Sequence, residues 1–153
     1  MNLESYRSAA ENRARLRIAS RIYNHSQSHA SILIDAMLRH TRGNEEVYVY
    51  SGQLPEAVYR PLLDCKARHI YLLLDENNGI TWLSKLLSPS RLTVYQIKHP
   101  RDNHFLVTTG GFFRFVKDKN KAEAEANFNE PSVCKVLIEA FHRYKEDASL
   151  IRV

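Results

Sequence analysis

Three short apolar runs alternate with segments of helical length in the first two thirds of the chain, and this alternation limits the folds open to it. The runs are EEVYVYSG at 45–52, HIYLLL at 69–74 and RLTVYQIKH at 91–99. The middle run is almost continuously apolar, which is typical of a strand covered on both faces. Strands joined by helix-length connections predict successive β-α-β units, so we expect a parallel sheet with right-handed crossovers.

The segments between these runs have helical features. A helix is predicted over 27–40, where Ser26 or Ser28 can cap its first turn. Its apolar face would consist of Ile32, Leu33, Ala36 and Met37. Further helices are predicted over 54–65 and, after an acidic turn, over 80–88. The first two thirds of the chain therefore predict an α/β domain.

In the last third of the chain the pattern becomes antiparallel. HFLVTT and FFRFV, joined by a Gly-Gly pair at 110–111, predict a β-hairpin. AEAEANF at 122–128 alternates small and charged residues and predicts another strand. The stretch 129–147 has apolar residues at the spacing of an amphipathic helix, with Asn129 as the expected cap and Pro131 in the first turn.

The N-terminal residues 3–24 are rich in helix-forming residues and contain neither Gly nor Pro, which predicts a long helix. Arg13, Arg17 and Arg21 are four residues apart, so they would lie along one face of that helix. This basic ridge is a candidate nucleic-acid-binding surface, because arginine side chains bind phosphate groups. The alternative is a solvated face balanced by neighbouring glutamates.

The composition as a whole is that of a soluble globular protein. The 153 residues suit a single core, so we divide the chain into a basic N-terminal helix, 1–25, and one α/β domain, 26–153. No apolar run approaches the ~20 residues that span a bilayer, and the first residues lack the apolar core of a secretory signal. We therefore expect a cytoplasmic protein. A formal net charge of +5 favours attraction to polyanions such as nucleic acids without conferring specificity.

The cysteine and histidine pattern predicts neither a metal ion nor a cofactor. Cys65 and Cys134 are isolated, and we interpret them as small buried residues. His25 and His29 could share a helix face, but the sequence places no third ligand within reach. No Gly-rich phosphate loop follows the first strand, so a nucleotide cofactor is not indicated.

The order of these elements resembles one half of a protein of the phospholipase D superfamily. One similar segment is the strand that begins at His104 and ends in the Gly turn. The other is AEANFNEPSVCKVLIEAF, which resembles the family's Gly-Ser-x-Asn segment and the helix after it, with Asn127 at the family's Asn. The resemblance covers most of residues 28–146. It implies a central mixed, mainly parallel sheet flanked by helices, with an extra N-terminal helix in this chain, and a homodimer, because the family pairs two halves about a pseudo-twofold axis.

The catalytic residues of that family are not retained. Its strand carries His-x-Lys followed by Asp: the His attacks phosphorus, the Lys neutralises phosphoryl oxygens and the Asp orients the imidazole. The two registers of this chain give either Asn103, Phe105 and Gly110 or His104, Leu106 and Gly111. They exclude each other because a one-residue slip turns every side chain to the opposite face. Neither register holds Lys or Asp, so the resemblance implies a catalytically inactive domain.

The resemblance therefore favours a protein that binds rather than cuts. The former active sites of two copies would face each other across a groove. A nucleic acid, another phosphate-bearing ligand or a protein partner would suit the polar and basic residues of this groove. These candidate ligand-binding residues are His99, Arg101, Asn103, His104 and Asn127.

Two other functions stay open. Asp75 and Glu76 follow the second apolar run, at the strand end where ligands of parallel sheets gather. Their carboxylates could hold Mg²⁺ in a metal-dependent phosphodiesterase or nuclease, or they could simply form an acidic turn. The remaining alternative, a regulatory or host-interaction protein of a phage or mobile element, rests on analogy with other small proteins that carry worn enzyme folds.

Overall fold

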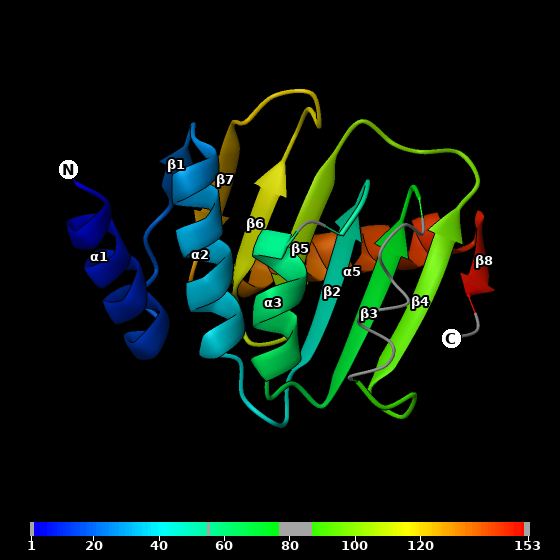
Figure 1. Cartoon of the computed structure of the whole chain (residues 1–153), viewed down its shortest axis with the longest axis horizontal. Helices are drawn as coiled ribbons and strands as arrows, with labels where there is room; N and C mark the ends of the chain where they lie inside the picture. Colours follow the sequence, from blue (N-terminus) through cyan, green and yellow to red (C-terminus); the bar gives the residue numbers. More distant parts are fainter. Residues whose placement is uncertain (1, 55, 77–86, 152–153) are drawn as a thin grey trace.

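A single mixed sheet of eight strands runs through the computed structural model of the chain, which describes residues 2–54, 56–76 and 87–151 (Figure 1). The strands lie in the order β1-β7-β6-β5-β2-β3-β4-β8. Their bounds are β1 Ile22–Asn24, β2 Glu46–Ser51, β3 His69–Leu74, β4 Leu92–Ile97, β5 His104–Thr108, β6 Phe113–Val116, β7 Ala124–Asn127 and β8 Ala148–Ile151. The described helices are α1 Leu3–Leu16, α2 Gln27–Arg39, α3 Glu56–Asp64 and α5 Pro131–Lys145.

The predicted β-α-β units and the predicted hairpin are both present. β2 and β3 pair in parallel, as do β3 and β4, with Tyr48 opposite Tyr71 and Leu72 opposite Val94. β5 and β6 run antiparallel on either side of the Gly turn. The sheet is mixed, as expected, but the mainly parallel character implied by the resemblance needs correction. Five of the seven pairings among the described strands are antiparallel, because both flanks of the sheet are built from antiparallel strands.

The sheet separates two hydrophobic layers. α1, α2 and α3 lie on one face, and α5 crosses the other (Figure 1). Side chains alternate between the two faces along each strand. Val47 and Val49 of β2 belong to the layer under α2 and α3, whereas Tyr48 and Tyr50 belong to the layer under α5.

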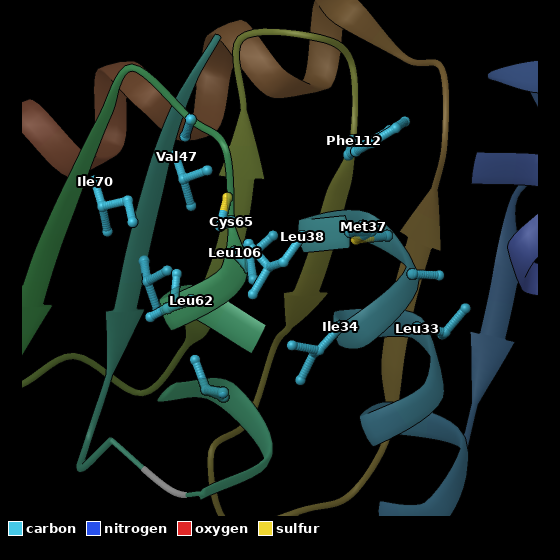
Figure 2. Packing of buried hydrophobic residues seen from close by; sticks show 14 of the residues in the cluster. Leu33, Ile34, Met37, Leu38, Val47, Leu62, Cys65, Ile70, Leu106 and Phe112 are labelled. Atoms are coloured by element: carbon cyan, nitrogen blue, oxygen red, sulfur yellow. The ribbon is translucent and has the colours of Figure 1, made fainter. Parts of the chain in front are cut away.

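α2 shows why the first layer forms where the sequence predicts it. The hydroxyl of Ser26 accepts a hydrogen bond from the amide of His29 (3.1 Å), so the helix begins at its predicted cap. Its buried residues recur at helical spacing; they are Ala30, Ile32, Leu33, Ile34, Ala36, Met37 and Leu38. Figure 2 shows several of them among side chains of α3 and the central strands. Each large apolar side chain buried in this way stabilises the fold by about 1.5–3 kcal/mol.

α5 begins one residue later than its predicted cap allows. Glu130, rather than Asn129, is the N-cap and makes no side-chain capping bond, while Pro131 occupies the first turn as predicted. The amide of Asn129 donates instead to Oδ1 of Asn127 (3.2 Å), which holds the chain in the preceding turn. The final strand, β8, follows this helix and is not predicted by the sequence pattern.

The N-terminal helix is shorter than predicted, so residues 1–25 do not form one helix. α1 ends at Leu16, and Arg17 takes up a left-handed backbone conformation (φ 51°) that closes the helix. The chain then forms β1, which pairs antiparallel with β7 at the edge of the sheet. This pairing overrides the helical preference of the residues involved. The helix predicted over 80–88 lies largely outside the described residues.

Candidate functional site

The carboxyl ends of the three parallel strands meet at one edge of the sheet, which we call the carboxyl edge. β2, β3 and β4 end there at Ser51, Leu74 and Ile97. β5 begins at the same edge, at His104, because it runs antiparallel to β2. The first turns of α2 lie beside this edge, at the top of Figure 1. Ligands of open parallel sheets bind at such an edge, so it is the natural place for a site.

An acid and an imidazole meet at the carboxyl edge. Asp75 directly follows β3, and its Oδ2 lies 3.5 Å from Nε2 of His104. The hydroxyl of Tyr50 donates to Oδ1 of Asp75 (2.7 Å), and Nζ of Lys119 lies 3.5 Å from Oδ2. The side chains of His104 and Asp75 are only 21% and 11% exposed. The sequence patterns place no acid near His104, and this expectation is wrong: the acid comes from the end of β3 rather than from the turn after β5.

Burial controls the charge of these groups. It lowers the pKa of His104 below the ordinary value, and Lys119 lowers it further, while the hydrogen bond and charge of Asp75 oppose the change. Burial also raises the pKa of the Tyr50 hydroxyl, which therefore stays protonated and donates to Asp75. A neutral imidazole beside a carboxylate can accept a proton or bind a ligand by hydrogen bonds.

A pocket of about 200 Å³ lies beside His104, between α2 and the β5–β6 hairpin. Part of its lining is aliphatic and comes from α2, α3 and the central strands: Ala30, Ile34, Val49, Val58 and Leu106. Another part is basic: His104, Arg114, Lys119 and Lys121. No Asp or Glu is among the described residues that line it. The pocket therefore has the charge and shape to take a small anion.

Arg114 supplies a cation that the sequence analysis does not identify. In the register that begins at His104, Leu106 takes the position of the family's lysine, and it pairs with Arg114 across the hairpin. Directly opposed residues share one face of a sheet, so Arg114 points to the same side as Leu106. The β-hairpin prediction does not give this pairing: counting outward from the Gly110-Gly111 pair sets Leu106 opposite Phe115, and the observed register is shifted by one residue.

Three of the candidate residues lie at the carboxyl edge but on the side of α5. His99 is held by Asp147, through its amide (3.0 Å) and its Nδ1 (2.9 Å). The guanidinium of Arg101 lies 4.9 Å from the centroid of the Tyr144 ring, and Nδ2 of Asn103 donates to the Tyr144 hydroxyl (3.2 Å). The hydrogen bond from His99 lowers the pKa of Asp147. These residues neighbour His104 along the chain, but their side chains face a different surface.

Asn127 does not reach the candidate site. It ends β7 opposite Phe113, next to the Gly turn, whereas His104 pairs with Val116 at the other end of the hairpin. Its Oδ1 accepts from the amide of Ser20 (3.0 Å), and its Nδ2 donates to Glu130 (2.8 Å). The groove expected to contain both His104 and Asn127 is therefore corrected, because the two residues lie at opposite edges of the sheet.

The three arginines expected on one helix face are separated by the structure. Arg13 is in the last turn of α1, Arg17 closes the helix, and Arg21 precedes β1. Arg17 forms a largely buried ion pair with Glu45 (2.6 Å). Arg21 pairs at the surface with Glu125 (3.3 Å) and with Glu130. The basic ridge does not exist in this form, because the helix ends before it can align the side chains.

The carboxylates considered for Mg²⁺ point to separate partners. Asp75 is engaged by Tyr50, His104 and Lys119, and Oε2 of Glu76 accepts from Nε2 of Gln53 (2.9 Å). Among the described residues, no group of three or more His, Cys, Asp or Glu side chains could hold a metal ion. The geometry therefore gives no support to a magnesium site at these two residues.

The predicted burial of both cysteines is confirmed. Cys65 and Cys134 are each 3% exposed, and burial raises the pKa of the Cys134 thiol to about 12. The cysteines are thus structural residues of the core.

His25 precedes α2, so it does not share a helix face with His29, which stacks on the ring of Tyr6.

Solved structures of similar fold include phospholipase D proteins. The chain is similar to Nuc, a phospholipase D family member from Salmonella typhimurium, with a TM-score of 0.67 and 12% identity over 89% of this chain and 100% of Nuc. It is also similar to TrmBL2, an archaeal chromatin protein with a novel mode of DNA binding (TM-score 0.65, 15% identity, 97% of this chain and 64% of TrmBL2). A third is the phosphatidylserine synthase of Haemophilus influenzae Rd KW20 (TM-score 0.57, 5% identity, 87% of this chain and 39% of the synthase). The chain thus spans less than two thirds of TrmBL2 and of the synthase.

The chain has the phospholipase D-like fold, which confirms the resemblance seen in its sequence. In this chain the fold is a single open sheet of eight strands flanked by the four described helices. No family model matches the chain, and no curated protein does. None of the described helices combines the length and apolar character needed to cross a membrane.

Proposed function

We propose that this chain is a phospholipase D-like domain that binds a phosphate-bearing ligand, nucleic acid above all, without cutting it, and that it works as a homodimer in the cytoplasm. One observation carries the proposal: Arg114, Lys119 and Lys121 line a pocket beside His104. Neither residue that could stand at the family's lysine position, Phe105 or Leu106, carries a charge.

This arrangement provides attraction for phosphate without the lysine that would stabilise the family's reaction. Loss of one transition-state donor typically costs ~3–4 kcal/mol in the barrier, whereas binding depends mainly on the number of cations near the phosphates. The net charge of +5 adds long-range attraction. The similarity to TrmBL2, itself a DNA-binding protein, is compatible with the same class of ligand.

The homodimer is proposed because the described residues match one half of the family's paired arrangement. A chain that aligns with the whole of Nuc and carries one carboxyl edge would pair with a second copy to form a continuous groove. Light scattering coupled to size-exclusion chromatography measures the mass directly, and twice the chain mass of 17.7 kDa is expected. A monomer at working concentrations would contradict the paired arrangement.

The binding proposal is tested by fluorescence anisotropy with labelled single- and double-stranded oligonucleotides in EDTA. We expect the affinity to fall steadily as the salt concentration rises, and the double variant Lys119→Met/Lys121→Met to reduce the salt slope by about two. Lys135→Met removes an exposed cation from α5 and serves as the control. No binding at low salt, or a slope unchanged in the double variant, would refute nucleic-acid binding at this edge.

A metal-independent phosphodiesterase is the second candidate, because Asp75 lies beside His104 as an orienting acid would. Hydrolysis of bis-p-nitrophenyl phosphate in EDTA, abolished by His104→Ala, would favour this activity over binding alone. Hydrolysis that requires Mg²⁺ and is lost in Asp75→Ala would favour the metal-dependent alternative. If the protein shows neither hydrolysis nor nucleic-acid binding, the leading candidate becomes a regulatory or host-interaction protein that acts by binding another protein. A pull-down experiment would identify that partner.

A further inference from the structure

Arg114 is a partly buried cation, and no carboxylate among the described residues pairs with it. Its Nε is buried without a hydrogen-bond partner, and burial lowers the pKa of the guanidinium. Among the described residues, none forms an ion pair or a side-chain hydrogen bond with Arg114. The hydroxyl of Tyr6, which acts electrostatically on Arg114, is itself buried and has no hydrogen-bond partner. A partly desolvated charge without a partner is unfavourable, so an anion that pairs with Arg114 would stabilise the folded protein.

The other cations of the pocket lie in the segment that follows β6. Lys119 and Lys121 line the pocket together with Arg114. Lys119 is partly neutralised by Asp75, at 3.5 Å. Three cations against one carboxylate leave about two positive charges around a small cavity, and His104 adds a neutral imidazole. The charge of the pocket thus matches a dianion better than a monoanion.

The size and walls of the pocket limit what the anion can carry. Its volume, about 200 Å³, is below the usual range of roughly 300–1,000 Å³ for drug-sized ligands. Aliphatic side chains of α2, α3 and β2 form one side of it. A phosphate with a short apolar or ring-shaped body would fill such a space, whereas an unbroken nucleic-acid strand could not enter it.

We propose that this pocket binds a phosphomonoester, with Arg114 paired to the terminal phosphate. The inference deepens the proposed function, on which it rests, by naming the group that the phosphate-bearing ligand presents. A phosphomonoester carries close to two negative charges at neutral pH, while an internal phosphodiester carries one. The group is either on a free small molecule or at the end of a nucleic-acid strand, and both sources share the same chemistry at Arg114.

The first experiment compares phenyl phosphate with methyl phenyl phosphate by isothermal titration calorimetry at pH 7.5. The two probes share a ring and differ in one negative charge. We expect phenyl phosphate to bind at least tenfold more tightly. Methyl phosphate, which lacks the ring, should bind more weakly than phenyl phosphate because it leaves the aliphatic wall uncovered. Equal affinity for the monoester and the diester would overturn the proposal.

Arg114→Met tests the residue itself, and Lys117→Met is its matched control. Both remove a cation from β6 or the residue after it, but Lys117 is exposed and does not line this pocket. Arg114→Met should lose at least tenfold in affinity for phenyl phosphate, and Lys117→Met should lose less than twofold. Without ligand, Arg114→Met should unfold at the same temperature as the natural chain or a higher one, because a partly buried charge without an ion-pair partner is removed. A purely structural role for Arg114 predicts the opposite shift.

A second variant keeps the charges and fills the space. Ser31 lies on α2 and lines the pocket, so Ser31→Phe should block phenyl phosphate while leaving Arg114 in place. This variant keeps the proposal falsifiable if Arg114→Met fails to fold. Phenyl phosphate that binds Ser31→Phe as tightly as it binds the natural chain would place the anion elsewhere.

Oligonucleotides separate the two sources of the phosphate and separate this inference from the proposed function. Tighter binding of a 5′-phosphorylated strand than of its 5′-hydroxyl twin, with competition by phenyl phosphate, assigns the group to a strand end. Equal binding of the two strands, with phenyl phosphate binding still dependent on Arg114, assigns the phosphate group to a free small molecule.

The same measurements separate this inference from the proposed function. If neither strand binds but phenyl phosphate does, the proposal of nucleic-acid binding fails and the proposal of the phosphomonoester pocket is supported. If both strands bind and phenyl phosphate does not, the pocket fails and nucleic-acid binding stands.

Discussion

Arg17 is the side chain that joins three separate segments of the chain at the edge opposite the candidate site. It donates to both carboxylate oxygens of Glu45 (2.6 and 2.7 Å), to the carbonyl of Gly110 (2.8 Å) and to the carbonyl of His40 (3.0 Å). Its guanidinium also lies 4.5 Å from the centroid of the Phe112 ring. With all of these partners, Arg17 holds the end of α1 against the β5–β6 turn, and its role is in stability.

Removing Arg17 should destabilise the protein far more than removing a neighbouring arginine. Arg17→Met leaves the carboxylate of Glu45, only 9% exposed, without its partner. The loss of one member of a buried ion pair costs about 3–5 kcal/mol. Urea unfolding followed by circular dichroism measures this loss. Arg15→Met is the control, since Arg15 is exposed and its described bond is to Asn12; it should change the free energy of unfolding by less than about 0.5 kcal/mol. Similar losses in both variants would show that the buried pair has no special weight.

At the scale of elements, the β5–β6 turn depends on two glycines for different reasons. Gly111 has a φ of +100°, a conformation that favours glycine, and a Cβ added at Gly110 would overlap the side chains of Glu45 and Arg17. Gly110→Ala and Gly111→Ala should therefore each lower the free energy of unfolding, by about 1–3 kcal/mol. A Cβ at Gly43 would meet its nearest atom, the carbonyl oxygen of Lys66, at an ordinary 3.6 Å. Thermal denaturation of the three variants tests the ranking, and a Gly43→Ala variant as unstable as the other two would contradict it.

The central elements were predictable because their own residues determine them. HIYLLL forms β3 at the predicted positions, since a continuous apolar run suits a strand covered on both faces. α2 and the hairpin likewise follow from a cap with helical spacing and from a Gly-Gly turn. The edge strands were not predictable from composition, because β1 and β8 exist only through pairing with β7 and β4. The error at the N-terminal helix comes from that same dependence on a distant partner.

At the scale of the whole molecule, the candidate site is an assembly of distant segments. Asp75 follows β3, and His104 begins β5. β4 lies between these two strands in the sequence, and β2 lies between them in the sheet, so only the strand order brings the two residues to one edge. The residue type of His104 and its place at the start of a strand were readable in the sequence, whereas its partner was not. Asn127 was misplaced for the converse reason. The likeness of its segment gave no information about the direction in which β7 runs.

The stability of the folded protein should decrease as the pH falls from about 8 to 5.5, and His104 should contribute to the decrease. Burial holds the pKa of His104 below its ordinary value of 6.5, so the unfolded chain binds a proton that the folded chain resists. Where the unfolded state binds more protons, the free energy of unfolding rises with pH, so the folded state loses stability as the pH drops through about 6.5. Urea unfolding at a fixed protein concentration and at pH 8, 7, 6 and 5.5 measures this slope, the fixed concentration being needed because a dimer's stability depends on it. His104→Gln should flatten the slope, because glutamine has no charge to gain. A slope that is equally steep in the variant would show that His104 takes up its proton as readily in the folded protein as in the unfolded chain, and the neutral imidazole inferred at the carboxyl edge would then be wrong.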